Sequence, residues 1–182
     1  MEGLEEKYKN MREHVRIDVR VPFAIRLLSD EEKQNIVSTV IGHYKFDIVS
    51  MKESSDKTLT EWLNTINKKL DSIISLLTIQ QHGFYELPLS SINISGGGLS
   101  FLSEKLYQKG DILEIKLLLD IPIPLGLYLY GEVIRSEKKN NKFDIGVKFI
   151  KINEEIQDCI IRYVLYKEKQ IIIQTKAISE GL

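Results

Sequence analysis

The sequence predicts a mainly β fold with helices: an antiparallel barrel or sandwich of short strands, split by a long helical insertion and closed by a C-terminal helix. Apolar and polar residues alternate near the start of the chain and again after residue 83, which is the period of half-buried strands. Over 29–82 apolar residues instead recur every three or four positions, as on a helix face. We therefore divide the chain into an arm with the first strand (1–28), a helical coiled-coil insertion (29–82) and the remainder of the β domain with its terminal helix (83–182).

The first strand is predicted over residues 17–27, where every odd position is apolar and Asp18, Arg20 and Arg26 lie between the apolar positions. Turn-forming residues separate the further strands, which we expect over 84–94, 99–102, 111–119, 125–135 and 142–150. A helix is expected after Asn153, because two glutamates and then an apolar face with helical spacing follow it. The pattern leaves two structures open for the tail 171–173, a longer helix or a short strand.

Two helices are expected in the insertion. Ser29 and Glu32 have the spacing of a capping box and precede apolar residues at helical spacing, which predicts a helix over about 30–50. Thr58 and Glu61 form a second possible capping box, ahead of a longer amphipathic helix.

The apolar residues of this second helix form a heptad seam, in which the spacing alternates between four and three. The seam consists of Leu59, Leu63, Ile66, Leu70, Ile73 and Leu77. Two interpretations remain open. Within one chain, the helix folds back on helix 30–50 or lies on the domain's own core; alternatively, it associates with copies of itself as a coiled coil. Trp62, Ile74 and Leu76 widen the stripe, which favours self-association and more than two helices. We expect a homo-oligomer through helices 30–80 and favour a tetramer, but so short a seam does not decide between trimer and tetramer.

Composition limits the classes of function. The 25 basic and 26 acidic residues give a net charge of −1, so there is no large cationic field for binding DNA or an anionic membrane surface. Charged residues and prolines interrupt the longest apolar stretch, so no membrane insertion is expected. The first ten residues are highly charged and lack an apolar core, so we expect a cytoplasmic protein. One cysteine and three histidines allow no intrachain disulfide and offer no metal-ligand spacing.

Two polar clusters could bind an anionic ligand. Arg12 and Arg16 lie just ahead of the first strand, and an arginine fork matches the paired acceptors of phosphate and of the guanine edge. Taken alone, such a pair is more often a solvated basic terminus. The second cluster, Asn93 to Gly98, combines short polar side chains with glycines that allow close approach of a ligand, although taken alone it would be read as a turn.

Together the clusters resemble the two signature motifs of the PilZ family, Arg12-x-x-x-Arg16 and Asn93-x-Ser95-x-x-Gly98. The resemblance continues through the later strands and the terminal helix and covers 8–28 and 84–168. The departure is the helical insertion between the motifs, which are usually a few tens of residues apart.

The resemblance implies a six-stranded antiparallel barrel whose N-terminal arm folds over cyclic di-GMP. By that analogy Arg12 and Arg16 grip guanine and phosphate, Asn93 and Ser95 hydrogen-bond the ligand, and Gly98 permits its close approach.

The expected function is therefore that of a cyclic di-GMP receptor, in which ordering of the arm signals to an unidentified protein target. Members of the family are associated with regulation of motility or exopolysaccharide. The alternative is an oligomeric PilZ-like adaptor that binds proteins and no nucleotide. An enzyme is not expected, because no nucleophile–base or paired-carboxylate constellation falls on adjoining turns, and no cofactor is expected besides the ligand.

Overall fold

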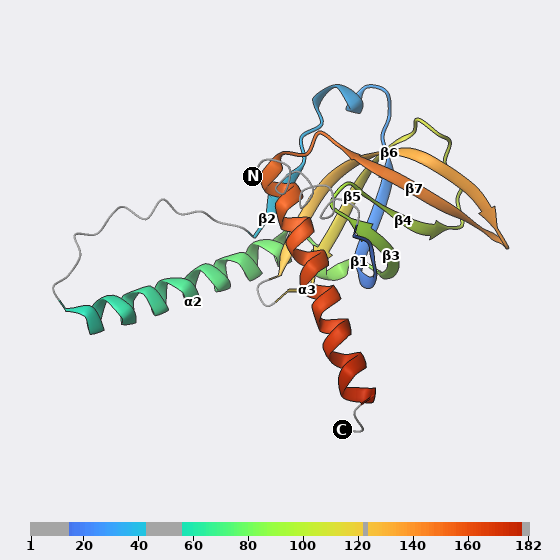
Figure 1. Cartoon of the computed structure of the whole chain (residues 1–182). Helices are drawn as coiled ribbons and strands as arrows, with labels where there is room; N and C mark the ends of the chain where they lie inside the picture. Colours follow the sequence, from blue (N-terminus) through green and yellow to red (C-terminus); the bar gives the residue numbers. More distant parts are fainter. Residues whose placement is uncertain (1–14, 43–55, 122–123, 180–182) are drawn as a thin grey trace, which may run out of the picture.

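The computed structural model describes residues 15–42, 56–121 and 124–179, with side chains up to residue 175 in the last helix. Within these residues one antiparallel sheet is accompanied by two α-helices and two short 3-10 helices (Figure 1). In chain order the elements are β1 (Ile17–Leu27), η1 (Glu32–Asn35), β2 (Thr39–Ile41), α2 (Lys57–Gln81), η2 (Phe84–Glu86), β3 (Leu89–Ser95), β4 (Gly98–Ser103), β5 (Ile112–Leu119), β6 (Leu125–Lys139), β7 (Lys142–Ile150) and α3 (Glu154–Ser179).

Six of the strands close into a barrel. The strand order along the sheet is β2-β6-β5-β1-β3-β4-β7, and β6 also pairs with β7, which completes the ring. The bent strand β1 contributes to closure by pairing with β3 over its first half and with β5 over its second. The short strand β2 adds to β6 outside this ring. The six-stranded antiparallel barrel implied by the resemblance is confirmed.

Helix α3 packs its apolar face onto the barrel core, where Ile156 and Tyr163 are almost fully buried. The hydroxyl of Tyr163 donates to Asp120 Oδ1 at 2.8 Å, and Lys167 Nζ lies 2.6 Å from Asp120 Oδ2. Burial, and then the hydrogen bond to Asp120, raise the pKa of Tyr163 above its ordinary 10.0, and the protonated hydroxyl is the donor in this bond. These contacts fix α3 to the end of β5.

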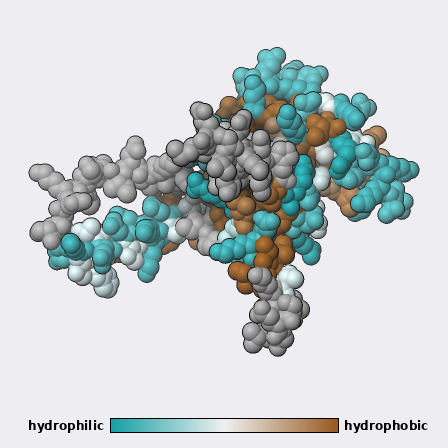
Figure 2. Space-filling view, viewed as in Figure 1, coloured by the Kyte–Doolittle hydropathy of each residue, from teal (hydrophilic) through white to brown (hydrophobic). Residues whose placement is uncertain are grey.

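The tail that the sequence left open continues α3 as a helix. The three isoleucines at 171–173 are each about half exposed, and hydrophobic side chains gather on the part of α3 that extends past the barrel (Figure 2). Neither of the two long helices, over the residues described, is both long and apolar enough to span a membrane.

The helix predicted over residues 30–50 is wrong in the part that the structure describes. Only Glu32–Asn35 forms a helical turn, and Thr39–Ile41 is strand β2, paired with β6. Residues 43–55 lie outside the described residues. The segment 36–41 is rich in isoleucine and valine, whose β-branched side chains favour extended backbone. The free side of β6 provides residues 39–41 with a partner strand.

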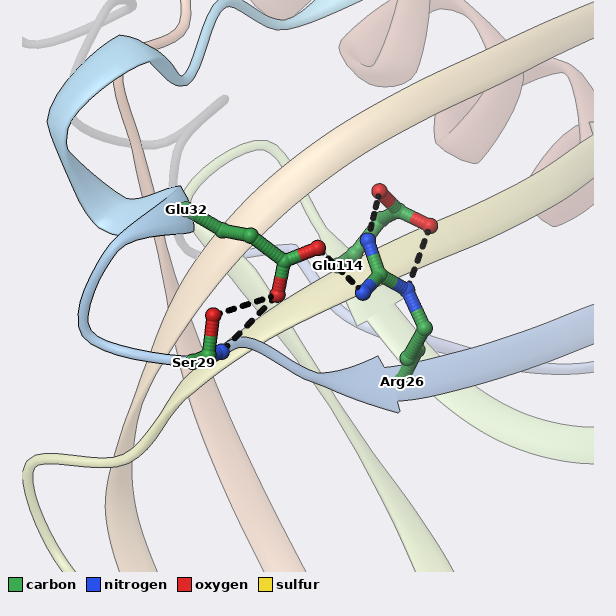
Figure 3. A network of polar contacts seen from close by, with 4 residues as sticks. All are labelled: Arg26, Ser29, Glu32 and Glu114. Atoms are coloured by element: carbon green, nitrogen blue, oxygen red, sulfur yellow. Dashed lines mark hydrogen bonds and ion pairs between the residues drawn. The ribbon is translucent and has the colours of Figure 1, made fainter.

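The predicted capping contacts are nevertheless formed, within a network centred on Arg26 (Figure 3). Arg26 Nε and Nη2 donate to Glu114 on β5 at 3.4 and 3.0 Å, and Nη1 donates to Glu32 Oε1 at 2.6 Å. Glu32 Oε2 accepts from the backbone N–H and hydroxyl of Ser29 at 2.9 and 3.0 Å. The capping pair therefore anchors a single turn to the barrel instead of starting a long helix.

The second predicted helix is confirmed as α2, but its cap is Asp56 instead of Thr58. Asp56 Oδ1 accepts from the backbone N–H groups of Thr58 and Leu59 at 3.0 and 3.2 Å, and an ionised carboxylate forms the stronger bonds. The other end of α2 is held by a small second core, from which the helix projects away from the barrel (Figure 1). The buried residues of this core are Ile79, Phe84 and Leu118.

The strand predicted over 84–94 begins later than expected, at Leu89. Gly83 ends α2 in the left-handed conformation, with φ of 70°, and the following turn carries Phe84 into the second core, where it is fully buried. The alternating pattern alone would start the strand at residue 84, but burial of the Phe84 ring favours a turn there instead.

Candidate functional site

Three polar side chains meet on the outer surface where β1 begins beside β3. Asp18 lies directly opposite Asn93 in the pairing of these strands, and Arg16 precedes β1 by one residue. Arg16 Nη1 donates to Asn93 Oδ1 at 3.5 Å, and Asn93 Nδ2 donates to Asp18 Oδ1 at 3.0 Å. Neighbouring residues of both strands point inward and are buried in the core, which holds the backbone of both strands in place. The pairing of β1 with β3 brings the predicted residues Arg16 and Asn93 together from distant parts of the sequence.

Asp18 is a member of this cluster that the sequence analysis did not single out as a site residue. Its carboxylate only accepts hydrogen bonds, so it fixes the Asn93 amide with the NH2 group facing Asp18 and Oδ1 facing Arg16. The signal in the sequence was its outward position in the alternating strand 17–27. The neighbour of Asp18 on the next strand depends on how β1 pairs with β3, and the alternating pattern does not specify that pairing.

The predicted residues Ser95 and Gly98 form the ends of the tight β3–β4 turn. They pair with each other, and the Ser95 hydroxyl, which is 2% exposed, donates to the Gly98 carbonyl at 3.2 Å. A Cβ atom at Gly98 would collide with the carbonyl oxygen of Val147 on β7. Both residues therefore have a structural role in the turn, and their predicted contacts with a ligand remain predictions.

A polar hollow of about 220 Å³ adjoins the cluster, between β1 and the second half of α3. Asp18 and Arg20 line it from β1, and Lys167, Gln170 and Gln174 line it from α3. Asp18 thus borders both the Asn93 contact and this hollow.

The predicted seam forms an exposed stripe along α2. Its six residues are between 41% and 60% exposed, namely Leu59, Leu63, Ile66, Leu70, Ile73 and Leu77. The buried residues of α2, Ser75 and Ile79, lie on the opposite side of the helix, given about 100° of rotation per residue. The barrel of the same chain therefore does not cover the stripe, and helix 30–50, the proposed partner in a hairpin, is not formed over its described part.

Arg12, the other predicted ligand residue, lies outside the described residues. Among the residues that the structure does describe, no group of three or more histidine, cysteine, aspartate or glutamate side chains could hold a metal ion.

Comparison with known proteins identifies the family of the β domain. A family model described as "PilZ domain" matches residues 76–166, half of the chain, from the last turns of α2 into α3. Arg16 and β1 lie outside the match, on the far side of the insertion. No curated protein matches the chain.

Among solved structures, the chain is similar to a pathogenic protein from Xanthomonas campestris, described as a new tetrameric PilZ domain self-assembled via an unusual helical bundle. The TM-score is 0.58 at 14% identity, with 88% of each chain covered. At this identity the similarity supports the fold alone.

Proposed function

Because the chain belongs to the PilZ domain family, we propose that it is a receptor for cyclic di-GMP that passes the signal to a protein partner. The observation that carries the proposal is the contact of Arg16 with Asn93 on the outer face of the barrel, beside the turn 95–98. Two signature residues separated by 76 positions of intervening chain are within hydrogen-bonding distance, at 3.5 Å.

The chemistry of this cluster fits a guanine nucleotide. A guanidinium carries five N–H donors, and the contact with Asn93 uses one of them at the long end of the hydrogen-bonding range. The paired acceptors of phosphate, or O6 and N7 of guanine, match the fork geometry of the remaining donors. A ligand can therefore engage Arg16 at the cost of one weak internal contact.

The N-terminal arm supplies the second part of the proposal. We expect Arg12 to bind the nucleotide from the arm, four residues ahead of Arg16 in the sequence. Binding then fixes the arm over the ligand, and the partner reads the changed surface.

We further propose that the receptor is a homotetramer held together by α2. The exposed seam supports this, because six large apolar side chains on one helix face are costly to leave in water and the barrel does not cover them. The solved relative that shares the fold is described as assembling through a helical bundle.

The experiment that tests the receptor function is isothermal titration of the full chain with cyclic di-GMP, with GTP as the control nucleotide. We expect micromolar binding of cyclic di-GMP only. Arg16→Ala should weaken it roughly ten- to hundredfold, since a charge-assisted bidentate contact contributes about 1.5–3 kcal/mol.

The matched control is Arg162→Ala, an exposed arginine on α3, which should bind like the wild type. Equal affinities of the Arg16 and Arg162 variants would refute the assignment of the site. Absence of heat with the wild type would refute the receptor function.

The second candidate function is that of an oligomeric adaptor, and the exposed seam of α2 is the observation that favours it. It predicts an intact oligomer that binds no nucleotide. The same titration, combined with a measurement of particle mass, separates the two functions.

A further inference from the structure

Strand β6 contains a β-bulge that changes which face of the barrel Arg135 occupies. Val133 lies opposite Val147 on β7, but the next pair is Arg135 with Gly146, so Ile134 is an extra residue. Val133 is buried in the core, and strict alternation would turn the side chain at 135 inward as well. The bulge turns Arg135 outward instead, and its side chain is 45% exposed. Bulges that re-aim a side chain in this way are common beside functional sites.

The outward face that Arg135 reaches is the face of the candidate site. Asn93 pairs with Ser100 on β4, Ser100 pairs with Gly146 on β7, and Gly146 pairs with Arg135. Paired residues of an antiparallel sheet share a face, so these four residues form one row across four strands. With neighbouring strands about 4.8 Å apart, the row spans roughly 14 Å from β3 to β6.

The middle of this row is a floor of two small residues, Ser100 and Gly146. The position of a Cβ atom at Gly146 lies 3.2 Å from Arg135 Cβ, 3.6 Å from Nε and 3.8 Å from Cζ, so the Arg135 side chain lies over this glycine. Arg135 Nη2 donates to Asp144, the residue two positions along β7, at 3.1 Å. The floor is thus bordered by Arg16 with Asn93 on one side and by Arg135 on the other.

We propose that Arg135 is a ligand-binding residue that grips the far side of the cyclic dinucleotide, which lies across Ser100 and Gly146. The inference rests on the proposed receptor function. It adds the guanidinium of Arg135 to that of Arg16 as a second positively charged group of the site. The ligand carries two phosphates and two guanines, and two arginine forks on opposite sides of a low floor match this duplicated set of acceptors. The ligand competes with Asp144 for the guanidinium, so Asp144 restrains Arg135 until the ligand arrives.

Titration of three full-length variants with cyclic di-GMP tests this role. Arg135→Ala should lower the affinity about tenfold or more, because a charge-assisted contact is lost. Asp144→Asn should leave the affinity unchanged or raise it, because the competing carboxylate charge is removed. Lys138→Ala, which removes an exposed cation from the same strand, is the matched control and should bind like the wild type.

The outcomes separate this inference from the receptor function itself. If Arg16→Ala weakens binding but Arg135→Ala does not, the receptor function stands and the role of Arg135 is refuted. If Arg135→Ala and Asp144→Asn weaken binding equally, the ion pair merely supports the β6–β7 hairpin, which also overturns the inference. If the wild type does not bind, both fail together. Ser100→Leu gives an independent check, since a bulky side chain on the floor should block the ligand while both arginines remain.

Discussion

Glu32 accepts three hydrogen bonds, two from the backbone and hydroxyl of Ser29 and one from Arg26. All three are stronger when the carboxylate is ionised, and together, the backbone bond first, they lower the pKa of Glu32 from its ordinary 4.5 to about 2. The folded-state pKa is thus below the unfolded one. The ionised carboxylate therefore stabilises the fold above pH 4.5, and this contribution is lost as the pH falls toward 2.

At the scale of this residue, Glu32→Gln should lower the melting temperature slightly at about pH 7, and the difference from the wild type should shrink as the pH falls from about 5 to 2. The effect is small because water and salt screen so exposed a group. Thermal unfolding across this pH range measures it. Glu31→Gln is the neighbouring control, since Glu31 makes no cap hydrogen bond through its side chain. A difference that stays constant with pH would contradict the assigned role.

Among the elements, helix α2 has two faces with different surroundings. Ser75 and Ile79 face the chain's own barrel, whereas the seam on the opposite side is exposed in the single chain. The helix is long and well capped at Asp56, so it forms a stiff projection. Such an arrangement leaves the seam available to other copies of the chain.

Leu70→Lys should convert the proposed tetramer to monomer, because assembly would bury a charge in an apolar bundle. The monomer itself should remain folded, since Leu70 is 51% exposed in the single chain. Light scattering coupled to size exclusion measures the mass. Asn64→Lys, which adds the same charge on another face of α2, should leave the mass unchanged. An unaltered mass in the Leu70 variant would show that the seam does not hold the copies together.

In the whole molecule, the two proposed activities are attached to different parts of the barrel. Helix α2 contacts β2, η2 and the first part of β6, where Gly126, Leu127 and Tyr128 pair with β2. The candidate site lies on β1, β3, β4 and β7 and reaches β6 only at Arg135, beyond the bulge. Over the described residues, the contacts of α2 and the candidate site lie on different strands except for β6, so we expect assembly and ligand binding to operate independently.

This separation predicts that the Leu70→Lys monomer binds cyclic di-GMP with the affinity of the wild-type oligomer. The measurement is the same titration at matched chain concentrations. A loss of affinity greater than about tenfold would mean that neighbouring copies contribute to the site. Assembly and ligand binding would then not be independent.

Local patterns in the sequence determined most strands, helix α2, the start of α3 and the polar signature at 93–98, because side-chain period and turn residues act over a few neighbouring positions. Tertiary structure decided the remainder. Residues 39–41 became a strand because β6 offered them a partner, and Asp18 joined the site because β1 pairs with β3 in one register. Arg135 faces outward because a bulge shifts the alternation of β6 against β7. Closure of the barrel around its core fixes which strands pair and in which register. These contacts join residues that are distant in sequence, so they produce no periodic pattern in the local sequence.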